Sequence, residues 1–271
     1  MPGRPSRKNA ANAFVYSVRG LAGARHATWT KFTLSAEWVV LVDPTTREAS
    51  VVMAPGSLTV DALVAGPITN GRDQSAVFAP TVWLHIYYIY NGTTLALTVS
   101  TTAPPTGPAL PSGYTQWAYA TTIRWDAGDF EPVIVSGCHV HNRQVIYMSA
   151  GTATAFTLVT GTISDGIPPN ARTVQGNAQL ATTSNGSGVV SSFGYLASST
   201  SGVPGSHEQV QIKLDRTGEA VNTPTKTDWH SFDLILQTSQ AFYYAIATVN
   251  GTAASLAVAI HGYTVSNGDG D

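Results

Sequence analysis

The sequence predicts an all-β protein made of antiparallel β-sandwich modules of the jelly-roll kind, with an extended N-terminal arm and no long helix. Short runs of β-branched and aromatic residues alternate with polar residues along most of the chain, which is typical of half-buried strands. Turn signals such as Asp43-Pro44, Pro55-Gly56 and Asn70-Gly71 separate these runs. No window shows a sustained 3.6-residue repeat with capping residues, so no long helix is expected.

The first 28 residues form the predicted arm. They are rich in Arg, Pro, Gly and Ala, and only a short segment from Phe14 to Val18 is apolar enough to pack. The basic residues from Arg4 to Lys31 all precede the first acidic residue, Glu37. A positive arm on a slightly acidic body is either a solvated tail or a segment that docks on an acidic partner surface.

The first β-sandwich module is expected over residues 29–135. Residues 32–63 give an antiparallel meander, and the polar loop that follows leads to an aromatic strand that begins at Thr81. That strand opens the central stretch 81–130, which continues as a hairpin, a proline-rich crossing and a further strand. The second module is expected over residues 136–271, where shorter runs alternate with turns such as Ile167-Pro168-Pro169-Asn170.

Composition limits the classes of function. Charged residues make up only 11% of the 271 residues while hydrophobic residues make up 43%, so the surface has to be covered by Thr, Ser, Asn, Gln and Gly. Such a surface favours packing against other protein chains and predicts a homo-oligomer. The net charge of -2 gives no indication of nucleic-acid binding.

Cysteine content and hydropathy indicate the compartment. The single cysteine, Cys138, excludes an internal disulfide, which favours synthesis in a reducing cytoplasm. No signal peptide is expected, because no apolar segment with a small-residue cleavage site follows the N-terminal basic residues. No apolar run approaches the length of a membrane span.

Two clusters suggest chemistry, and neither meets its requirements. His139 and His141 are spaced so that both imidazoles share one face of a strand, but the carboxylate that a cupin-type metal site needs does not follow them. Asp126, Asp129 and Glu131 resemble a carboxylate pair for glycoside hydrolysis, but their Gly-containing context favours a turn. The sequence therefore predicts no catalytic residue, no metal and no cofactor.

Aromatic residues near predicted strand ends leave two interpretations open. Flat rings beside Asn or Asp stack on sugars, whereas the same rings also serve as anchors of a core or a subunit interface. Core or interface roles are favoured for most of them. The residues retained as glycan-binding candidates are Tyr195, Trp229 and His230.

The central stretch resembles a module of tailed-bacteriophage virion proteins. The segment 83–94 (WLHIYYIYNGTT) is followed at 97–104 by LTVSTTAP and at 110–115 by LPSGYT, which is the order of motifs in tail fibres, head fibres, minor capsid and receptor-binding proteins. Residues 120–126 match the arginine-containing strand that comes next. The chain differs from the usual motifs at Trp117 and Trp125 and in the extra prolines of its crossing.

The resemblance implies a non-enzymatic β-sandwich component of a virion, commonly trimeric, made in the host cytoplasm. The arm would attach it to other virion proteins of the capsid, neck or tail, and the C-terminal half would be exposed. The alternative is a receptor-binding module of a tail fibre that recognises a host surface glycan. The residues expected to make the virion contact are Arg4, Arg7, Lys8, Phe14, Tyr16 and Arg19.

Overall fold

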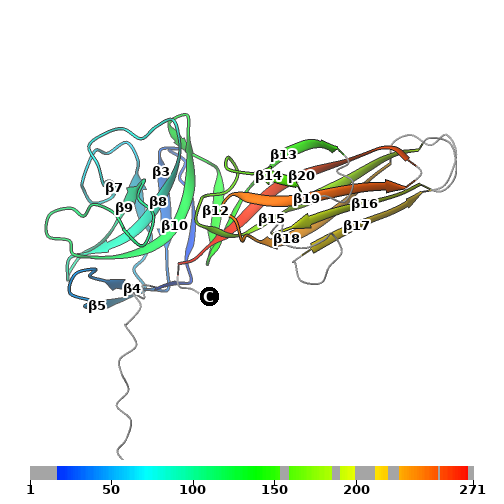
Figure 1. Ribbon diagram of the computed structural model, residues 1–271. Coiled ribbons are helices and arrows are strands. Elements are labelled where there is room, and N and C mark those ends of the chain that lie inside the picture. The colour runs from blue at the N-terminus through cyan, green and yellow to red at the C-terminus, as the bar shows by residue number, and fades with distance from the viewer. Residues whose placement is uncertain are drawn as a thin grey trace, which may run out of the picture. The chain divides into compact units, whose positions relative to one another are not determined.

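The protein consists of β-strands, in agreement with the predicted fold class. The computed structural model describes residues 17–152, 159–184, 190–198, 211–218, 226–249 and 251–267, and these contain strands, turns and loops but no helix. The chain divides into two compact units: unit 1 comprises Met1–Phe130 with Asn267–Asp271, and unit 2 comprises Glu131–Ser266. Both units contain antiparallel sheets packed in layers (Figure 1), which confirms the expected β-sandwich architecture.

Unit 1 has a large sheet and a small one. The large sheet has the strand order β1-β4-β10-β8-β9-β7, with β5 beside β4 and β11 beside β10, and only β7 and β9 pair in parallel. The small sheet has the order β2-β3-β6. The strands are β1 (Ser17–Arg19), β2 (Ala22–Arg25), β3 (Lys31–Ser35), β4 (Trp38–Val42), β5 (Ala49–Met53), β6 (Leu58–Asp61), β7 (Gly71–Arg72), β8 (Thr81–Tyr90), β9 (Leu95–Ser100), β10 (Gln116–Asp126) and β11 (Asp129–Phe130).

The core of unit 1 lies between these two sheets. Strands β8 and β10 are buried over most of their length, which explains their nearly continuous run of aromatic and β-branched residues. The ring of Phe130 meets Phe32 of the small sheet and Trp125 of the large sheet, both edge to face, with centroid distances of 5.6 and 5.1 Å. Aromatic contacts of this geometry stabilise the packing beyond the area they bury.

The hairpin and the crossing of the central stretch have separate structural roles. Asn91 ends β8, and its side-chain oxygen accepts hydrogen bonds from the backbone N–H groups of Thr93 and Thr94, which fixes the turn into β9. The crossing, residues 101–115, contacts both β8 and β10: the hydroxyl of Tyr87 on β8 donates to the carbonyl oxygen of Thr102. Gly107 of the crossing lies directly on the indole of Trp117.

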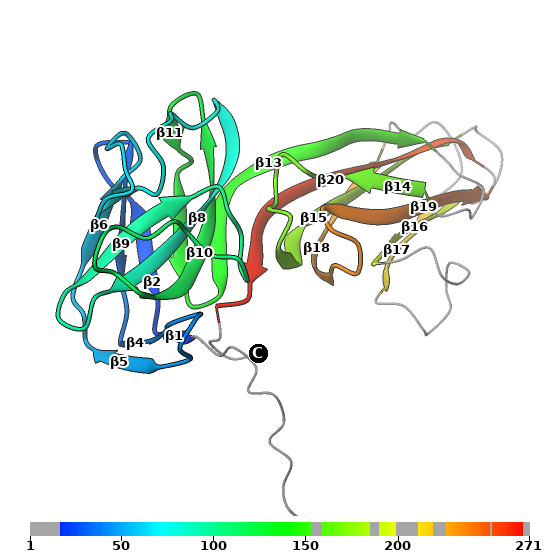
Figure 2. The ribbon, with the colours of Figure 1, turned by 60° about the vertical axis from the view of Figure 1, so that its left-hand side comes forward.

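Unit 2 is a sandwich of two sheets (Figures 1 and 2). One sheet has the order β18-β15-β20-β13-β12 and the other has the order β14-β19-β16-β17. The strands are β12 (Val133–Ser136), β13 (His139–Thr152), β14 (Val159–Thr162), β15 (Ala171–Ser184), β16 (Val190–Ala197), β17 (Gln211–Gly218), β18 (Lys226–Ile235), β19 (Ala241–Val249) and β20 (Gly251–Val265).

Alternation of burial along β15 and β18 gives the five-stranded sheet of unit 2 two different faces. Val174 of β15 is buried opposite Leu234 of β18, and Ala178 is buried two rows further along. Gln175 and Asn177, which alternate with these core positions, are polar and point to the other face. The sheet therefore packs one face on the core and presents a polar face to solvent.

The predicted arm and module boundaries can be located on this architecture. Residues 17–25, which the sequence placed in the arm, contain β1 and β2 and pair with β4 and β3. Residues 1–16 lie outside the described residues. The two units meet in the chain between Phe130 and Glu131, five residues before the module boundary expected at 135/136.

Candidate functional site

The solvent-facing side of the five-stranded sheet in unit 2 carries a cluster of polar and aromatic side chains. We call this set the polar face. Antiparallel pairing places residues of neighbouring strands directly opposite one another, so the set forms rows across the sheet. Its members are His139, His141, Thr173, Gln175, Asn177, Gln179, Trp229, Ser231, Asp233, His261 and Thr264.

Hydrogen bonds order the side chains within these rows. Nε2 of Gln175 donates to Oδ2 of Asp233 at 3.1 Å. In the next row, Oγ of Ser231 donates to Oδ1 of Asn177 at 3.0 Å. The amide and carboxylate groups therefore have defined orientations although they face solvent.

A β-bulge brings His261 into the polar face. Strand β20 pairs Ile260 with Gly176 and Gly262 with Gln175, so His261 is an extra residue with no register partner on β15. The adjacent Gly262 leaves a notch, because a β-carbon there would lie 3.1 Å from Oε1 of Gln175 and 3.7 Å from Nδ1 of His141. The absence of a side chain at Gly262 thus leaves that oxygen and that nitrogen facing a shared space.

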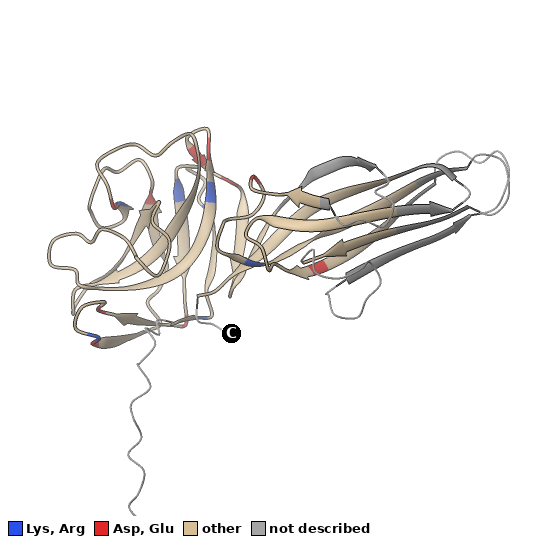
Figure 3. Cartoon of the chain, viewed as in Figure 1, with Lys and Arg blue, Asp and Glu red and all other residues tan. Residues whose placement is uncertain are grey.

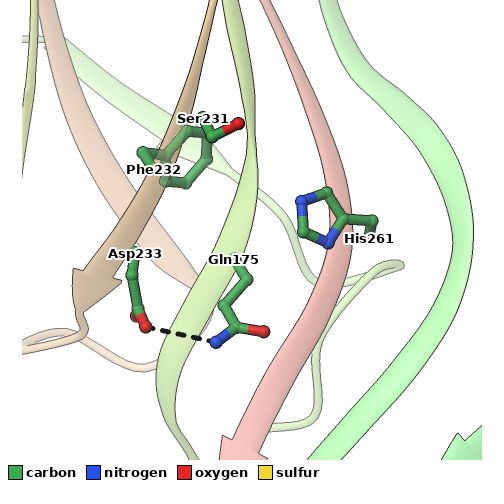
Figure 4. A pocket seen from close by; sticks show the side chains of 5 residues that line it. All are labelled: Gln175, Ser231, Phe232, Asp233 and His261. Atoms are coloured by element: carbon green, nitrogen blue, oxygen red, sulfur yellow. Dashed lines mark hydrogen bonds between the residues drawn. The ribbon is translucent and has the colours of Figure 1, made fainter.

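An open depression of about 450 Å³ lies on this part of the sheet. Figure 4 shows the imidazole of His261 on one side of it and the Gln175–Asp233 pair on the other. Oε1 of Gln175 and Oδ1 of Asp233 make no hydrogen bond within the described part of the chain. The lining residues are Gln175, Ser231, Phe232, Asp233 and His261.

The structure does not bring the three glycan-binding candidates onto one surface. Trp229 lies on the polar face, opposite Gln179, and its side chain is 48% exposed. His230 is the next residue and points to the other side of the sheet, opposite the buried Ala178. Tyr195 lies on β16 of the other sheet and is only 7% exposed, so its ring has no open face for a ligand.

The lining residues of the depression were missed by the sequence analysis. A partial signal exists, since polar residues recur at every second position in the segments 173–179 and 229–233. The bulge at His261 has no such signal, because it depends on the register between β15 and β20.

Unit 1 has a second candidate surface at the outer strand β5. Among the described residues β5 pairs only with β4, so one of its backbone edges is open. Cross-strand rows place Met53, Trp38 and Arg19 side by side, and Val51, Val40 and Ser17 in the next row. Val51 is 60% exposed and Met53 is 68% exposed. We call Arg19, Trp38, Val40, Val51 and Met53 the edge patch; Figure 2 shows β5 and β4 beside β1.

Only one of the predicted attachment residues can be placed. Arg19 is the last residue of β1 and belongs to the edge patch, where its Nε lies 3.9 Å from Oε2 of Glu37. Both side chains are largely exposed, so this ion pair contributes little to stability. The other five, Arg4, Arg7, Lys8, Phe14 and Tyr16, lie outside the described residues.

The clusters considered for chemistry take structural positions. The rings of His139 and His141 stack on β13 with a centroid distance of 6.0 Å. Asp126 and Asp129 flank the tight turn between β10 and β11, and Asp126 accepts a hydrogen bond from the hydroxyl of Thr81. The described residues contain no group of three or more His, Cys, Asp or Glu side chains that would hold a metal ion.

Unit 1 contains one buried histidine. Nδ1 of His85 lies 2.7 Å from the hydroxyl of Thr122, and burial lowers the pKa of His85 to about 4. The imidazole is therefore neutral at physiological pH. It lies in the interior of unit 1, so we assign it a packing role.

Comparison with known proteins identifies no family for this chain. No protein-family model and no curated protein sequence matches it. The described residues also contain no helix of the length and hydropathy needed to cross a membrane.

Three solved structures illustrate the available structural likenesses. The structure of the infectious bursal disease virus Gx strain has 8% sequence identity and a TM-score of 0.28, and the match covers 93% of this chain and 72% of that chain. The VP2 subviral particle of the same virus gives 10% identity and a TM-score of 0.29, covering 92% and 72%. The mosquito-larvicidal Cry4Aa toxin of Bacillus thuringiensis gives 9% and 0.21, covering 93% and 52%. Because these TM-scores are low, we draw the function from the chain's own residues.

Proposed function

We propose that the protein is a non-enzymatic structural component of a tailed-phage particle, attached to other virion proteins through unit 1 and its N-terminal segment. Two features of unit 1 support this assignment: its sequence motifs and its surface. The motifs that resemble phage virion proteins, residues 83–115, form β8, β9 and the crossing, so the resemblance extends into the core of unit 1. The second feature is the surface chemistry of the same unit.

The edge patch is the observation that carries the proposal. An open strand edge with large exposed apolar side chains is rare on a protein that acts alone, because it pairs with other chains. Val51 and Met53 form such an edge, and Arg19, which is paired with Glu37, lies in the neighbouring strand β1. Because β1 begins at Ser17, the basic N-terminal segment enters unit 1 beside this patch. Together they would form one attachment surface for a virion protein of acidic character.

The scarcity of charge fits an assembled particle. Figure 3 shows few Lys, Arg, Asp or Glu residues on the described strands of either unit. Chains that bury much of their surface between copies need little charge for solubility, and three copies of an attachment segment strengthen binding through avidity. We therefore propose a homotrimer, synthesised in the host cytoplasm and exposing unit 2 on the particle.

Localisation on particles tests this function. Mass spectrometry of purified phage particles is expected to detect the chain at a fixed copy number, and labelling with an antibody against unit 2 is expected to place it by electron microscopy. A variant lacking residues 1–16, which leaves every described strand intact, is expected to fold but to be depleted from particles. Absence of the wild-type chain from particles would refute the proposal, and full incorporation of the truncated chain would refute the role of the N-terminal segment.

A further inference from the structure

We infer that the depression on the polar face of unit 2 is a binding site for an uncharged saccharide, with the Gln175–Asp233 pair and His261 holding ring hydroxyls and Trp229 stacking on a neighbouring ring. This inference concerns unit 2 alone and does not depend on the assignment to a particle. The glycan-binding candidates suggested by the sequence define a different set, of which only Trp229 belongs to this site.

The hydrogen-bonding groups of the site match a polyol. Asp233 uses Oδ2 to accept from Gln175, which leaves Oδ1 of Asp233 and Oε1 of Gln175 as the remaining acceptors of the pair. Both oxygens therefore accept from hydroxyl donors. The imidazole of His261 provides a ring nitrogen across the depression that can donate or accept. Neighbouring hydroxyls of a sugar need this combination of fixed acceptors and an adaptable partner.

The site is organised before any ligand binds. The hydrogen bond to Asp233 fixes the amide of Gln175 in one orientation, so its oxygen faces the notch at Gly262. Ser231 is fixed in the same way by Asn177. Preorganised groups lose little conformational entropy on binding, which is what a weak, hydroxyl-rich ligand requires.

Trp229 supplies the apolar part of the site. It lies on the same strand and the same face as Asp233, four residues away, which corresponds to roughly 14 Å along a strand. The ligand therefore needs more than one linked sugar ring: one over the depression and a further ring against the indole. Aromatic rings with one exposed face are suited to this contact because sugars present apolar C–H groups on one side.

The charge of the site selects against acidic ligands. Among the residues that the structure describes, none that lines the depression is Lys or Arg, and Asp233 contributes a negative charge. A phosphate, sulfate or carboxylate group would meet this carboxylate without a cationic partner, which disfavours its binding. An uncharged hexose chain has no such penalty.

A glycan array with the full-length protein tests the inference. The array carries neutral hexose and N-acetylhexosamine oligosaccharides of increasing length, together with sialylated and sulfated forms of the same chains. Binding is expected to neutral oligosaccharides, to increase with the number of linked rings until the chain spans the distance from Asp233 to Trp229, and to fall when an acidic group is added. Isothermal titration calorimetry with the best neutral oligosaccharide then gives the dissociation constant.

Variants locate the binding on the polar face. Asp233→Ala is expected to weaken binding at least about tenfold, which is the loss of one hydrogen bond to a charged group. Trp229→Ala is expected to weaken it about threefold to tenfold. The matched controls are Asp165→Ala, at an exposed position in the turn between β14 and β15, and Trp29→Ala, at a residue of unit 1 that is 57% exposed. Both controls are expected to bind as the wild type does.

Three results would overturn the inference: no binding to any neutral oligosaccharide at millimolar concentration, binding only to acidic glycans, or equal affinity of Asp233→Ala and the wild type. Thermal unfolding of each variant checks that the fold is kept. If Asp233→Ala does not fold, Asp233→Asn replaces it, because an amide keeps the shape and one acceptor while it removes the charge, and reduced affinity is again expected.

Discussion

Gln175 and Asp233 face each other across β15 and β18, and their side chains are joined by a hydrogen bond of 3.1 Å from Nε2 to Oδ2. Because the pair is exposed, its hydrogen bond orients the two side chains more than it stabilises the fold. A neutral donor opposite a carboxylate is one of the few arrangements that keep both groups in a defined position on an open sheet.

Replacement of Gln175 by Glu is expected to destabilise unit 2 at neutral pH. Gln175→Glu places two carboxylates directly opposite each other, and like charges in a cross-strand pair cost about 0.5–1 kcal/mol. The loss is expected to decrease at high salt, which screens the repulsion between the two exposed carboxylates. Thermal unfolding at low and at high ionic strength measures it relative to the wild type. Gln179→Glu, opposite the uncharged Trp229, is the control, and an equal loss in both variants would contradict the explanation.

Packing of the crossing on β10 leads to a second prediction. Gly107 has a φ of 79°, and a β-carbon there would lie 2.6 Å from the indole of Trp117. Gly107→Ala is expected to lower the free energy of unfolding by about 2–4 kcal/mol, since it combines backbone strain with overpacking. The matched control is Gly113→Ala, where φ is 83° but no atom lies within 4 Å.

Gly113→Ala is expected to cost only the backbone strain, about 1 kcal/mol. Chemical denaturation of the two variants separates the steric contribution from the conformational one. If both variants lose the same amount, the contact between the crossing and Trp117 does not restrain the crossing.

Much of this architecture follows from local sequence patterns. The hairpin at Asn91, the turn at Ala127 and Gly128, and the alternating burial of β15 depend on nearest neighbours and on a period of two, so they can be predicted. The exposure of Tyr195 could not be predicted in this way. Consecutive residues of β16 from Tyr195 to Ala197 are buried, so neither face of the strand is exposed here, and this burial depends on tertiary packing.

The site depends on the register between strands, that is, on which residues of two paired strands lie opposite each other. Residues that are close together in the sequence do not determine this register. Gln175 and Asp233 are far apart in the chain and meet only because β15 and β18 pair with one particular alignment. A shift of one residue would place Phe232 on the polar face and Asp233 in the core. His261 reaches the depression only through the bulge in β20.

Loss of the hydroxyl group is expected to have different effects on the free energy of unfolding at two adjacent tyrosines of β8. The hydroxyl of Tyr87 donates to the carbonyl oxygen of Thr102 at 2.6 Å, so Tyr87→Phe is expected to cost about 1 kcal/mol and to leave that carbonyl without this donor. The hydroxyl of Tyr88 is buried without a hydrogen-bond partner in the described part of the chain, and burial raises its pKa. Tyr88→Phe is therefore expected to be neutral or stabilising by up to about 1 kcal/mol. Equal losses in urea denaturation would contradict this assignment.

Because His85 is buried, we expect the protein to lose stability in mild acid. The pKa of His85 is about 4 in the folded protein and near 6.5 when unfolded, so the unfolded state takes up the proton first as the pH falls. The contribution of neutral His85 is complete above pH 6.5 and decreases between pH 6.5 and about 4, by about 3 kcal/mol in total.

Urea denaturation at several pH values measures this dependence. The comparison is with His85→Gln, which can keep a hydrogen bond to Thr122 but does not titrate. Its stability is expected to depend less on pH in that window, whatever its stability at pH 7. Asp43, whose pKa is lowered first of all by the backbone N–H of Thr46, acts in a different range, because its contribution is lost only below the ordinary pKa of 3.8. Parallel pH profiles for wild type and variant would exclude His85 as the cause.

The edge patch gives the last prediction, which concerns assembly. Met53→Lys adds a charge at a side chain that is 68% exposed, so the isolated fold is expected to keep its stability within about 0.5 kcal/mol. A lysine on an open strand edge opposes pairing with another chain. Incorporation into particles is therefore expected to fall at least about tenfold, measured by quantitative mass spectrometry against the major capsid protein.

The control is Val77→Lys, at a residue that is 71% exposed in unit 1 but outside the patch. Because both variants add the same charge to the same unit, a fall for Met53→Lys alone would assign attachment to β5, whereas equal incorporation would move the attachment surface elsewhere.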